Sequence, residues 1–410
     1  MEINYAGCKT ICVPAPPETD YEKLIKNPTS FRAFLDPIIE KHPELFPEGI
    51  SNGYWLHGTV HSKKLNLTTR RIQLLTNKAV YQIRPDSALP YMVGLTDDVE
   101  KALYLRRFGV PIDALVYVFG RNPSYWYRLY QAIGRFSIVG TTIKAPEAIP
   151  LNLTSDEKHS KRKGSKIFIP TTVSCGCFLG VDLVPTAKTI DLVKGYGTFR
   201  QEAQNLKPDY QPETVNTDGW DQTQLAWQQL FPGIAIILCF LHSILDIQKR
   251  CRKDKALWKK VTGPMWYIYK APSKRHFAQR LRRVREWAKQ NIKTSQTILN
   301  RLMKLKDKSK QFQVAYDHPE GARTSNMVDR LMNYQDRLLF NMQCFHGSEE
   351  AARRYLRAMA LIWNFHPYGR RTITSAPDRH TPFKDFNGFE YHENWLRNLL
   401  IAGSMNGYRQ

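Results

Sequence analysis

The chain has 410 residues, enough for two or three domains with a sizeable core, and its hydrophobic fraction of 42% is that of an ordinary folded protein. Its 60 lysines and arginines outnumber 37 aspartates and glutamates, and the net charge of +23 predicts a polyanionic partner. The seven scattered cysteines exclude a disulfide framework, and the longest apolar run, residues 233–241, is far below the roughly 20 residues that cross a bilayer.

The opening segment, MEINYAGCKTICVPAPP, has no apolar core of the length that a secretory signal peptide needs. Together with the lack of a long apolar run, this predicts a soluble, cytoplasmic protein with no membrane partner. For a cytoplasmic protein with a large positive charge, the polyanion that we expect is nucleic acid.

Residues 1–95 are predicted to form a small α+β module. Residues 22–41 have a helical pattern, and residues 54–85 are typical of alternating strands joined by a turn at Asn77-Lys78. The same region contains a Cys-x3-Cys and a His-x3-His pair, which together offer the four ligands of a zinc site. Their loose spacing favours structural or chance placement instead, and the sequence leaves both interpretations open for Cys8, Cys12, His57 and His61.

Residues 96–145 are predicted to contain three short helices, and the third begins with Asn122 as its cap and Pro123 at its first position. Two short helices joined by a glycine-containing turn are typical of a helix-turn-helix. The candidate recognition helix is residues 123–133, and an ordinary helical connector is the alternative. The side chains that would reach DNA are Ser124, Tyr125, Tyr127, Arg128 and Gln131.

Residues 150–245 are predicted to form a mixed five-stranded sheet of three strands, a helix, a strand, a helix and a fifth strand. Asp156 is expected at the end of the first strand, and Asp218 at the end of the fourth. In this order the two strands lie side by side, so their carboxylates would converge. Paired carboxylates suit Mg²⁺, and two such ions support phosphodiester cleavage.

Residues 246–315 are predicted to be helical and strongly basic. Between Lys249 and Lys310 there are 21 basic and 3 acidic residues, interleaved with aromatic side chains, a composition that suits phosphate contact and base stacking. A solvated helical face is the alternative. Residues 316–410 complete the chain with further helices, one of them near residue 327 and another at residues 351–365.

Four segments carry a resemblance to a known family: SDEKHSKRKGSKIFIPTTV, TVNTDGWDQTQLAW, LFPGIAIILCFLH and GARTSNMVDRLMN. They resemble bacterial insertion-sequence transposases of the DDE type over roughly residues 96–370. The resemblance implies an RNase H-like catalytic core, and the Mutator-like members add an all-helical insertion and a Cys-x-x-His motif after the second acid. Cys239 and His242 match that motif, and we expect a structural or hydrogen-bonding role for both.

The resemblance assigns the first two catalytic acids to Asp156 and Asp218, which are 62 positions apart (218 − 156). It assigns the third to Asp329 in TSNMVD, where the family usually has glutamate. The shorter side chain still ligates a metal ion, but has to lie about one methylene closer. The three acids would hold two Mg²⁺ or Mn²⁺ ions. Alternatives for the third acid are Asp336, Glu349 and Glu350.

The resemblance implies a DNA transposase that cleaves and joins strands at the ends of a mobile element. Its partners would be double-stranded terminal repeats and target DNA, bound by a homodimer or larger assembly at the bacterial nucleoid. An inactive, transposase-derived DNA-binding protein and an RNase H-like nuclease are the alternatives. Further residues are expected to contact DNA: Arg128, Lys158, His159, Arg282, Arg283 and Arg323. Glu157 and Arg330, which adjoin the first and third acids, are expected to do so as well.

Overall fold

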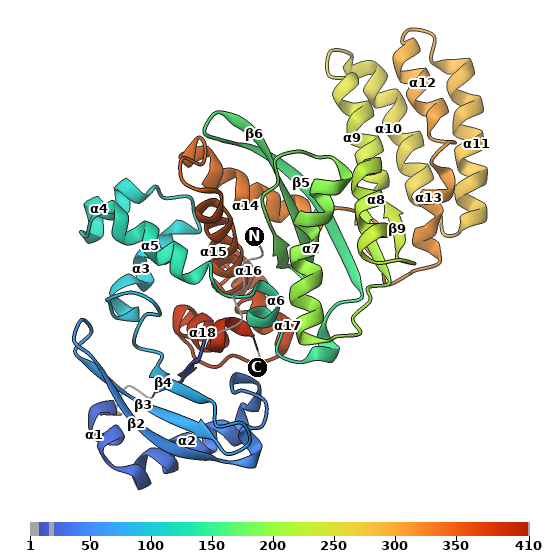
Figure 1. Ribbon diagram of the computed structural model, residues 1–410. Helices are drawn as coiled ribbons and strands as arrows, with labels where there is room; N and C mark the ends of the chain where they lie inside the picture. The colour runs from blue at the N-terminus through green and yellow to red at the C-terminus, as the bar shows by residue number, and fades with distance from the viewer. Residues whose placement is uncertain (1–7, 16–19, 409–410) are drawn as a thin grey trace.

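The computed structural model describes residues 8–15 and 20–408 and has an α+β fold with two mixed sheets, as the sequence predicts in outline. In Figure 1 a small four-stranded module lies at one end of the molecule and a bundle of helices at the other. Between them lies a five-stranded sheet, with helices packed against it.

The N-terminal module pairs its strands in the order β1-β4-β3-β2, with only β1 and β4 parallel. The helical pattern of residues 22–41 is two helices rather than one, because Asn27 ends the first and its side chain caps the second. Pro28 explains the break, since a proline pushes the preceding residue out of the helical region. The elements are β1 Thr10–Val13, α1 Tyr21–Lys26, α2 Pro28–Lys41, β2 Tyr54–Ser62, β3 Leu67–Leu74 and β4 Val80–Pro85.

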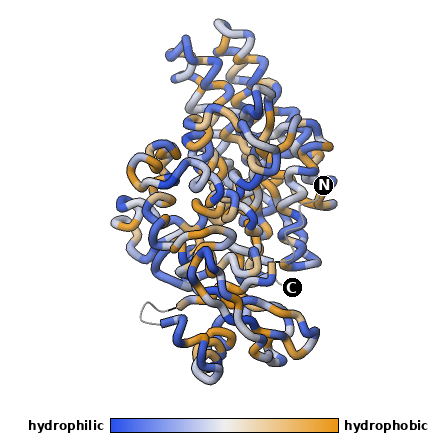
Figure 2. The backbone as a smooth tube through the Cα atoms, turned by 60° about the vertical axis from the view of Figure 1, so that its left-hand side comes forward, coloured by the Kyte–Doolittle hydropathy of each residue, from blue (hydrophilic) through white to orange (hydrophobic). Residues whose placement is uncertain are grey.

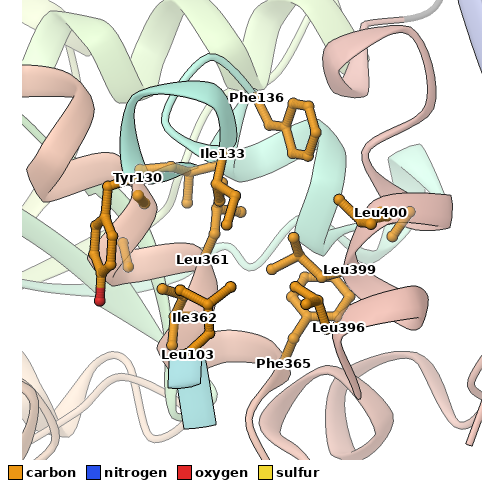
Figure 3. Packing of buried hydrophobic residues seen from close by; sticks show 14 of the residues in the cluster. Leu103, Tyr130, Ile133, Phe136, Leu361, Ile362, Phe365, Leu396, Leu399 and Leu400 are labelled. Atoms are coloured by element: carbon orange, nitrogen blue, oxygen red, sulfur yellow. The ribbon is translucent and has the colours of Figure 1, made fainter. Parts of the chain in front are cut away.

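Next come the helices α3 (Thr96–Arg106), α4 (Ile112–Phe119), α5 (Pro123–Ile133) and α6 (Ile138–Thr142). The third of these, α5, packs on α15 (Glu349–Phe365), and Figure 3 shows their shared apolar core. Side chains from α3, α5, α15 and α18 (Trp395–Ala402) meet there, among them Leu103, Ile133, Leu361, Phe365 and Leu399. The C-terminal helices therefore fix the helical region to the rest of the chain.

The central sheet has the strand order β7-β6-β5-β8-β9. The first three strands form an antiparallel meander. Strand β8 then pairs in parallel with β5, and β9 pairs in parallel with β8. The strands are β5 Asn152–Arg162, β6 Ser165–Ser174, β7 Cys177–Val181, β8 Thr214–Thr217 and β9 Ala235–Leu238. The short strands β8 and β9 are almost wholly buried, as expected for parallel strands covered on both faces.

Helices cover the central sheet. The crossover helices α7 (Thr189–Leu206) and α8 (Asp221–Leu230) pack on each other, and α7 contacts β6 and β7. Helix α14 (Asn326–Met342) contacts β5 and β6, and α15 contacts β7. Because side chains alternate along β5, Glu157 faces α7 and α8 while its neighbours Asp156 and Lys158 face α14.

The basic segment forms the helices α9 Phe240–Arg250, α10 Lys255–Tyr269, α11 Lys274–Asn291, α12 Gln296–Lys304 and α13 Ser309–Gln313. Apolar residues at helical spacing, such as Val261, Met265 and Ile268 on α10, are buried between these helices. Hydrophilic and hydrophobic residues alternate along them in Figure 2. In the described part of the chain, no helix combines the length and apolarity of a membrane span. Two short helices, α16 (Arg370–Ser375) and α17 (Pro382–Asn387), precede α18.

Candidate active site

Asp156 lies in the middle of β5, and the prediction that the strand ends there is wrong. The strand continues to Arg162 and turns into β6 at Lys163 and Gly164, whose φ angles are 48° and 83°. The charged residues after Asp156 form a hairpin, as the sequence predicts for residues 157–165, and cross-strand hydrogen bonds with β6 sustain it.

Asp218 is the first residue after β8, at the carboxyl edge of the sheet. Thr154 and Asn216 are partners in the parallel register of β5 and β8. Asp156 and Asp218 each follow two residues later, so both start from the same face of neighbouring strands. Asp218 is exposed, and its carboxylate accepts the N–H of Trp220 at 2.9 Å.

Asp156, His242 and Asp329 converge at this edge, and one ligand atom of each lies within 4.8 Å of the other two. They come from three elements: β5, the start of α9 directly after β9, and the first turn of α14. Asp218 is not one of the three, but its charge acts on Asp156 and His242. The structure thus brings Asp156 and Asp329 together and adds a histidine that the sequence assigned to a structural role.

Negative charge is concentrated in this cluster. Burial, and next the charge of Asp218, raise the pKa of Asp156 to about 6. The pKa of His242 is raised to about 9, first by its hydrogen bond with Cys239 and also by the charges of Asp218 and Asp156, while burial opposes the rise. The His242 imidazolium therefore offsets part of the carboxylate charge at neutral pH.

Cys239 and Ser325 position the side chains of His242 and Asp329. The backbone N–H of Ser325 donates to the Cys239 sulfur at 3.2 Å, and the Ser325 hydroxyl donates to the Asp329 carboxylate at 2.9 Å. Burial raises the pKa of the Cys239 thiol, but hydrogen bonds from His242 and Ser325 outweigh it and bring that pKa below its usual value. Cys239 thus has the hydrogen-bonding role that the sequence predicts.

The donor atoms of the cluster fit a divalent cation. The charge of Asp329 opposes the ionisation of Asp156, an effect that a bound cation offsets, and the oxygens of both carboxylates suit Mg²⁺ or Mn²⁺. The imidazole of His242 is a nitrogen donor, which transition metals accept more readily than Mg²⁺ does. Asp156 and Asp329, with His242 and the adjacent Asp218, are the residues that would hold such ions.

A cleft of about 410 Å³ opens from Asp218 and His242 toward the helical insertion. Its lining also includes Lys249 of α9, Arg301 and Lys304 of α12, and Lys308, whose ammonium group donates to the carbonyl of Gly219 at 3.0 Å. The acids Asp246 and Asp307 also line the cleft, and Asp246 pairs with Arg301 at 3.4 Å. Cations beside metal-binding carboxylates suit the approach of a phosphodiester strand. The sequence predicts the basic insertion but not this cleft.

Glu157 lies on the opposite face of β5 and is not placed to contact DNA as the sequence suggested. Its carboxylate accepts hydrogen bonds from the hydroxyls of Tyr196 and Thr223, both at 2.6 Å. Burial raises its pKa to about 7, although the two hydrogen bonds oppose the rise. Glu157 therefore joins β5 to the helices α7 and α8.

Asp336, Glu349 and Glu350, which the sequence also offered as the third acid, form ion pairs. Asp336 pairs with Lys158 at 2.7 Å, while Glu349 and Glu350 pair with arginines of their own helix, α15. The acid that the described residues place beside Asp156 and His242 is Asp329. The geometry therefore favours Asp329 as the third acid.

The predicted DNA contacts fall into two groups. Lys158 is held by its ion pair, and Arg323 donates to the carbonyl of Tyr269 and the hydroxyl of Tyr316, so both cations make contacts within the protein. The exposed predicted contacts are Ser124, Tyr127, Arg128, His159, Arg282, Arg283 and Arg330.

The proposed zinc ligands do not share a site. Cys12 lies on β1, whereas His57 and His61 lie on β2 at the opposite edge of the four-stranded sheet. Strands β4 and β3 lie between β1 and β2, so three strand spacings, about 14 Å in all, separate Cys12 from the histidines. Burial raises the pKa of the Cys12 thiol to about 12, which also opposes metal binding.

Comparison of the chain with models of protein families, and with curated proteins, finds no match.

Proposed function

We propose that the protein is a DNA transposase with an RNase H-like catalytic core, which cleaves and joins strands at the ends of a mobile element. The observation that carries the proposal is the convergence of Asp156, Asp329 and His242, beside Asp218, at the carboxyl edge of the central sheet. The strand order β7-β6-β5-β8-β9, with three antiparallel strands followed by two parallel ones, supports an RNase H-like core.

Two divalent ions, when bound, supply activation of the attacking oxygen and stabilisation of the leaving oxygen in phosphodiester cleavage. The acids of this chain would hold and orient them: Asp156 from the middle of β5, Asp218 from the end of β8 and Asp329 from α14. Lys249 and Lys304 line the same cleft and would bind the phosphates of the strand, beside Arg301 and Lys308, which also pair with Asp246 and with the Gly219 carbonyl.

Asp329, in place of the glutamate usual in the family, is compatible with this site. The first turn of α14 brings its carboxylate within 4.8 Å of the ligand atoms of Asp156 and His242. The Ser325 hydroxyl fixes its orientation with a hydrogen bond. The shorter side chain therefore reaches the other ligands, which supports an active enzyme.

A strand-cleavage assay tests the proposal. The substrate is a labelled duplex carrying the inverted repeats that flank the gene, with Mg²⁺ or Mn²⁺ and with EDTA as the blank. We expect cleavage by the wild type and a loss of at least 1,000-fold in Asp218→Asn, with DNA affinity retained, because a metal-holding carboxylate is removed. Asp221→Asn is the matched control, since Asp221 is an exposed aspartate three residues further on.

Three results would contradict the proposal. DNA binding without cleavage by the wild type would identify an inactive, transposase-derived binding protein. Cleavage that follows branched or RNA-containing substrates rather than the repeat sequence would identify a nuclease. Equal cleavage by Asp218→Asn and the wild type would exclude the proposed site.

A further inference from the structure

A second cavity, of about 670 Å³, lies between the four-stranded sheet and the N-terminal end of α5. The sheet contributes residues of β1, β2 and β4, the connection to α3 contributes residues 89–93, and α5 contributes Ser124, Tyr125 and Arg128. None of the residues of the candidate active site lines it. Its volume is within the range of about 300–1,000 Å³ typical of sites for small organic ligands.

The cavity is positively charged. Lys64, Arg84 and Arg128 line it, and among its described lining residues there is no aspartate or glutamate. Arg84 is only 8% exposed, and although its guanidinium donates to the carbonyl of Ala88, its Nε has no hydrogen-bond partner among the described residues. The guanidinium charge of Arg84 at the wall of the cavity favours an anionic ligand.

The N-terminal end of α5 adds to this charge. The helix has 11 residues, and its cap Asn122 and first-turn residue Ser124 both line the cavity. The helix dipole places partial positive charge at this end, which favours a phosphate group. Arg84 supplies the independent, buried charge that a helix end alone does not.

The lining also includes the aromatic side chains of Tyr91 and Tyr125 and the amide side chains of Gln82, Asn122 and Asn406. The rings of Tyr91 and Tyr125 are covered by guanidinium groups, Arg135 at 4.4 Å from one centroid and Arg121 at 5.2 Å from the other. The buried Tyr125 hydroxyl has no partner among the described residues. Gly94 is required beside it, because a Cβ there would come within 2.6 Å of that hydroxyl. Stacked aromatics and guanidinium planes are surfaces on which a nucleobase packs.

We propose that this cavity binds one unpaired nucleotide of a DNA strand. Its phosphate lies against Lys64, Arg84 and Arg128, and its base lies among Tyr91, Tyr125 and the neighbouring apolar side chains. The choice of DNA, rather than another nucleotide-bearing ligand, rests on the proposed function. The cavity requires both the sheet and α5, so the N-terminal module and the predicted recognition helix bind DNA as one unit.

Fluorescence anisotropy with the full chain in EDTA tests this inference without cleavage. Two labelled duplexes are compared, one fully paired and one with a single unpaired nucleotide. We expect the wild type to bind the second at least tenfold more tightly. Lys64→Gln and Arg128→Gln should each reduce this preference about threefold or more, because each removes a phosphate contact. Ser124→Trp, which fills the cavity at an exposed position without changing charge, should abolish it.

Matched controls are Lys26→Gln and Arg371→Gln, which change exposed cations outside the cavity and should leave the preference unchanged. Arg84→Gln is compared with them after its folding has been checked by circular dichroism, since Arg84 is buried. Cavity variants that bind both duplexes like the wild type would overturn the inference. Binding of dAMP without binding of either duplex would overturn the assignment to a DNA strand.

The two proposals fail separately. If the wild type and Asp218→Asn both fail to cleave DNA while the cavity variants lose the preference, the transposase chemistry is excluded and the nucleotide site stands. If cleavage depends on Asp218 while the cavity variants retain the preference, only the nucleotide site is excluded.

Discussion

Cys239 and Ser325 are 86 residues apart in the chain and hold each other through two hydrogen bonds. The thiol donates to the Ser325 hydroxyl at 3.4 Å, and the Ser325 backbone N–H donates to the sulfur at 3.2 Å. This contact joins the end of β9 to the start of α14, across the whole helical insertion. His242 comes three residues after Cys239, and Asp329 comes four residues after Ser325. The proximity of His242 and Asp329 therefore depends on this contact.

Replacing Cys239 should change the titration of His242. In Cys239→Ala the imidazolium loses the hydrogen bond that contributes most to its raised pKa, so this pKa should fall from about 9 toward 6.5. NMR titration of the histidine ring protons in EDTA measures it. Cys251→Ala is the control, because Cys251 is also buried but lies at the far end of α9. An unchanged pKa in Cys239→Ala would contradict the thiol's role.

Removing the Ser325 hydroxyl should weaken metal binding. The hydroxyl orients the Asp329 carboxylate without being a ligand, and loss of such a group typically costs 10–100-fold in metal affinity. We expect Ser325→Ala to bind Mn²⁺ about tenfold more weakly than the wild type in isothermal titration calorimetry. Ser375→Ala, at an exposed position on α16, should bind like the wild type. Equal affinities of all three proteins would show that Asp329 needs no such support.

The proximity of Asp156 and Asp218 follows from local patterns in the sequence. Each aspartate comes after a short β-branched or apolar run, and the strand-helix-strand order makes their strands parallel neighbours. His242 could have been found in the same way, because it follows β9 at the same edge of the sheet. Its position three residues after Cys239 instead suggested a helix contact.

The surroundings of Glu157 could not be predicted in this way. In the sequence it belongs to a charged run, SDEKHSK, which predicts a basic hairpin but not which face of it is buried. The continuation of β5 through Asp156 sets the alternation that directs Glu157 toward α7. The cavity beside α5 likewise depends on how the N-terminal module packs against the helices, which no local pattern encodes.

A buried ion pair between Glu202 of α7 and Arg357 of α15 should be important for stability. The two side chains are 4% and 3% exposed, and Glu202 also accepts from the Ser137 hydroxyl at 2.9 Å and the Val139 N–H at 3.0 Å. Removing one charge leaves the other buried and uncompensated, at a cost of about 3–5 kcal/mol. We therefore expect Glu202→Gln to lower the free energy of unfolding in urea by about that amount.

Glu350→Gln, on the helix α15 that also carries Arg357, provides the comparison. Glu350 pairs with Arg354, but its side chain is 50% exposed, so loss of this pair should cost less than about 1 kcal/mol. Similar effects of the two substitutions would mean that burial does not strengthen the Glu202 pair.

Glu157 should make the protein less stable as the pH rises. Burial raises its pKa from 4.5 to about 7, so between these values the folded protein holds a proton that the unfolded chain has released. The free energy of unfolding therefore falls with increasing pH across this window, by at most about 3 kcal/mol, and Glu157→Gln should remove this contribution. Asp156, whose pKa is about 6, acts in the same direction and remains in the variant. The pH dependence of the variant's free energy of unfolding therefore becomes smaller rather than zero.

Urea unfolding at pH 5 and pH 8 in EDTA measures the difference, and the exposed Glu147→Gln should retain the wild-type pH dependence. If Glu157→Gln also retained it, the Glu157 carboxyl would have to be ionised in the folded protein at pH 5, contrary to its burial between Tyr196 and Thr223.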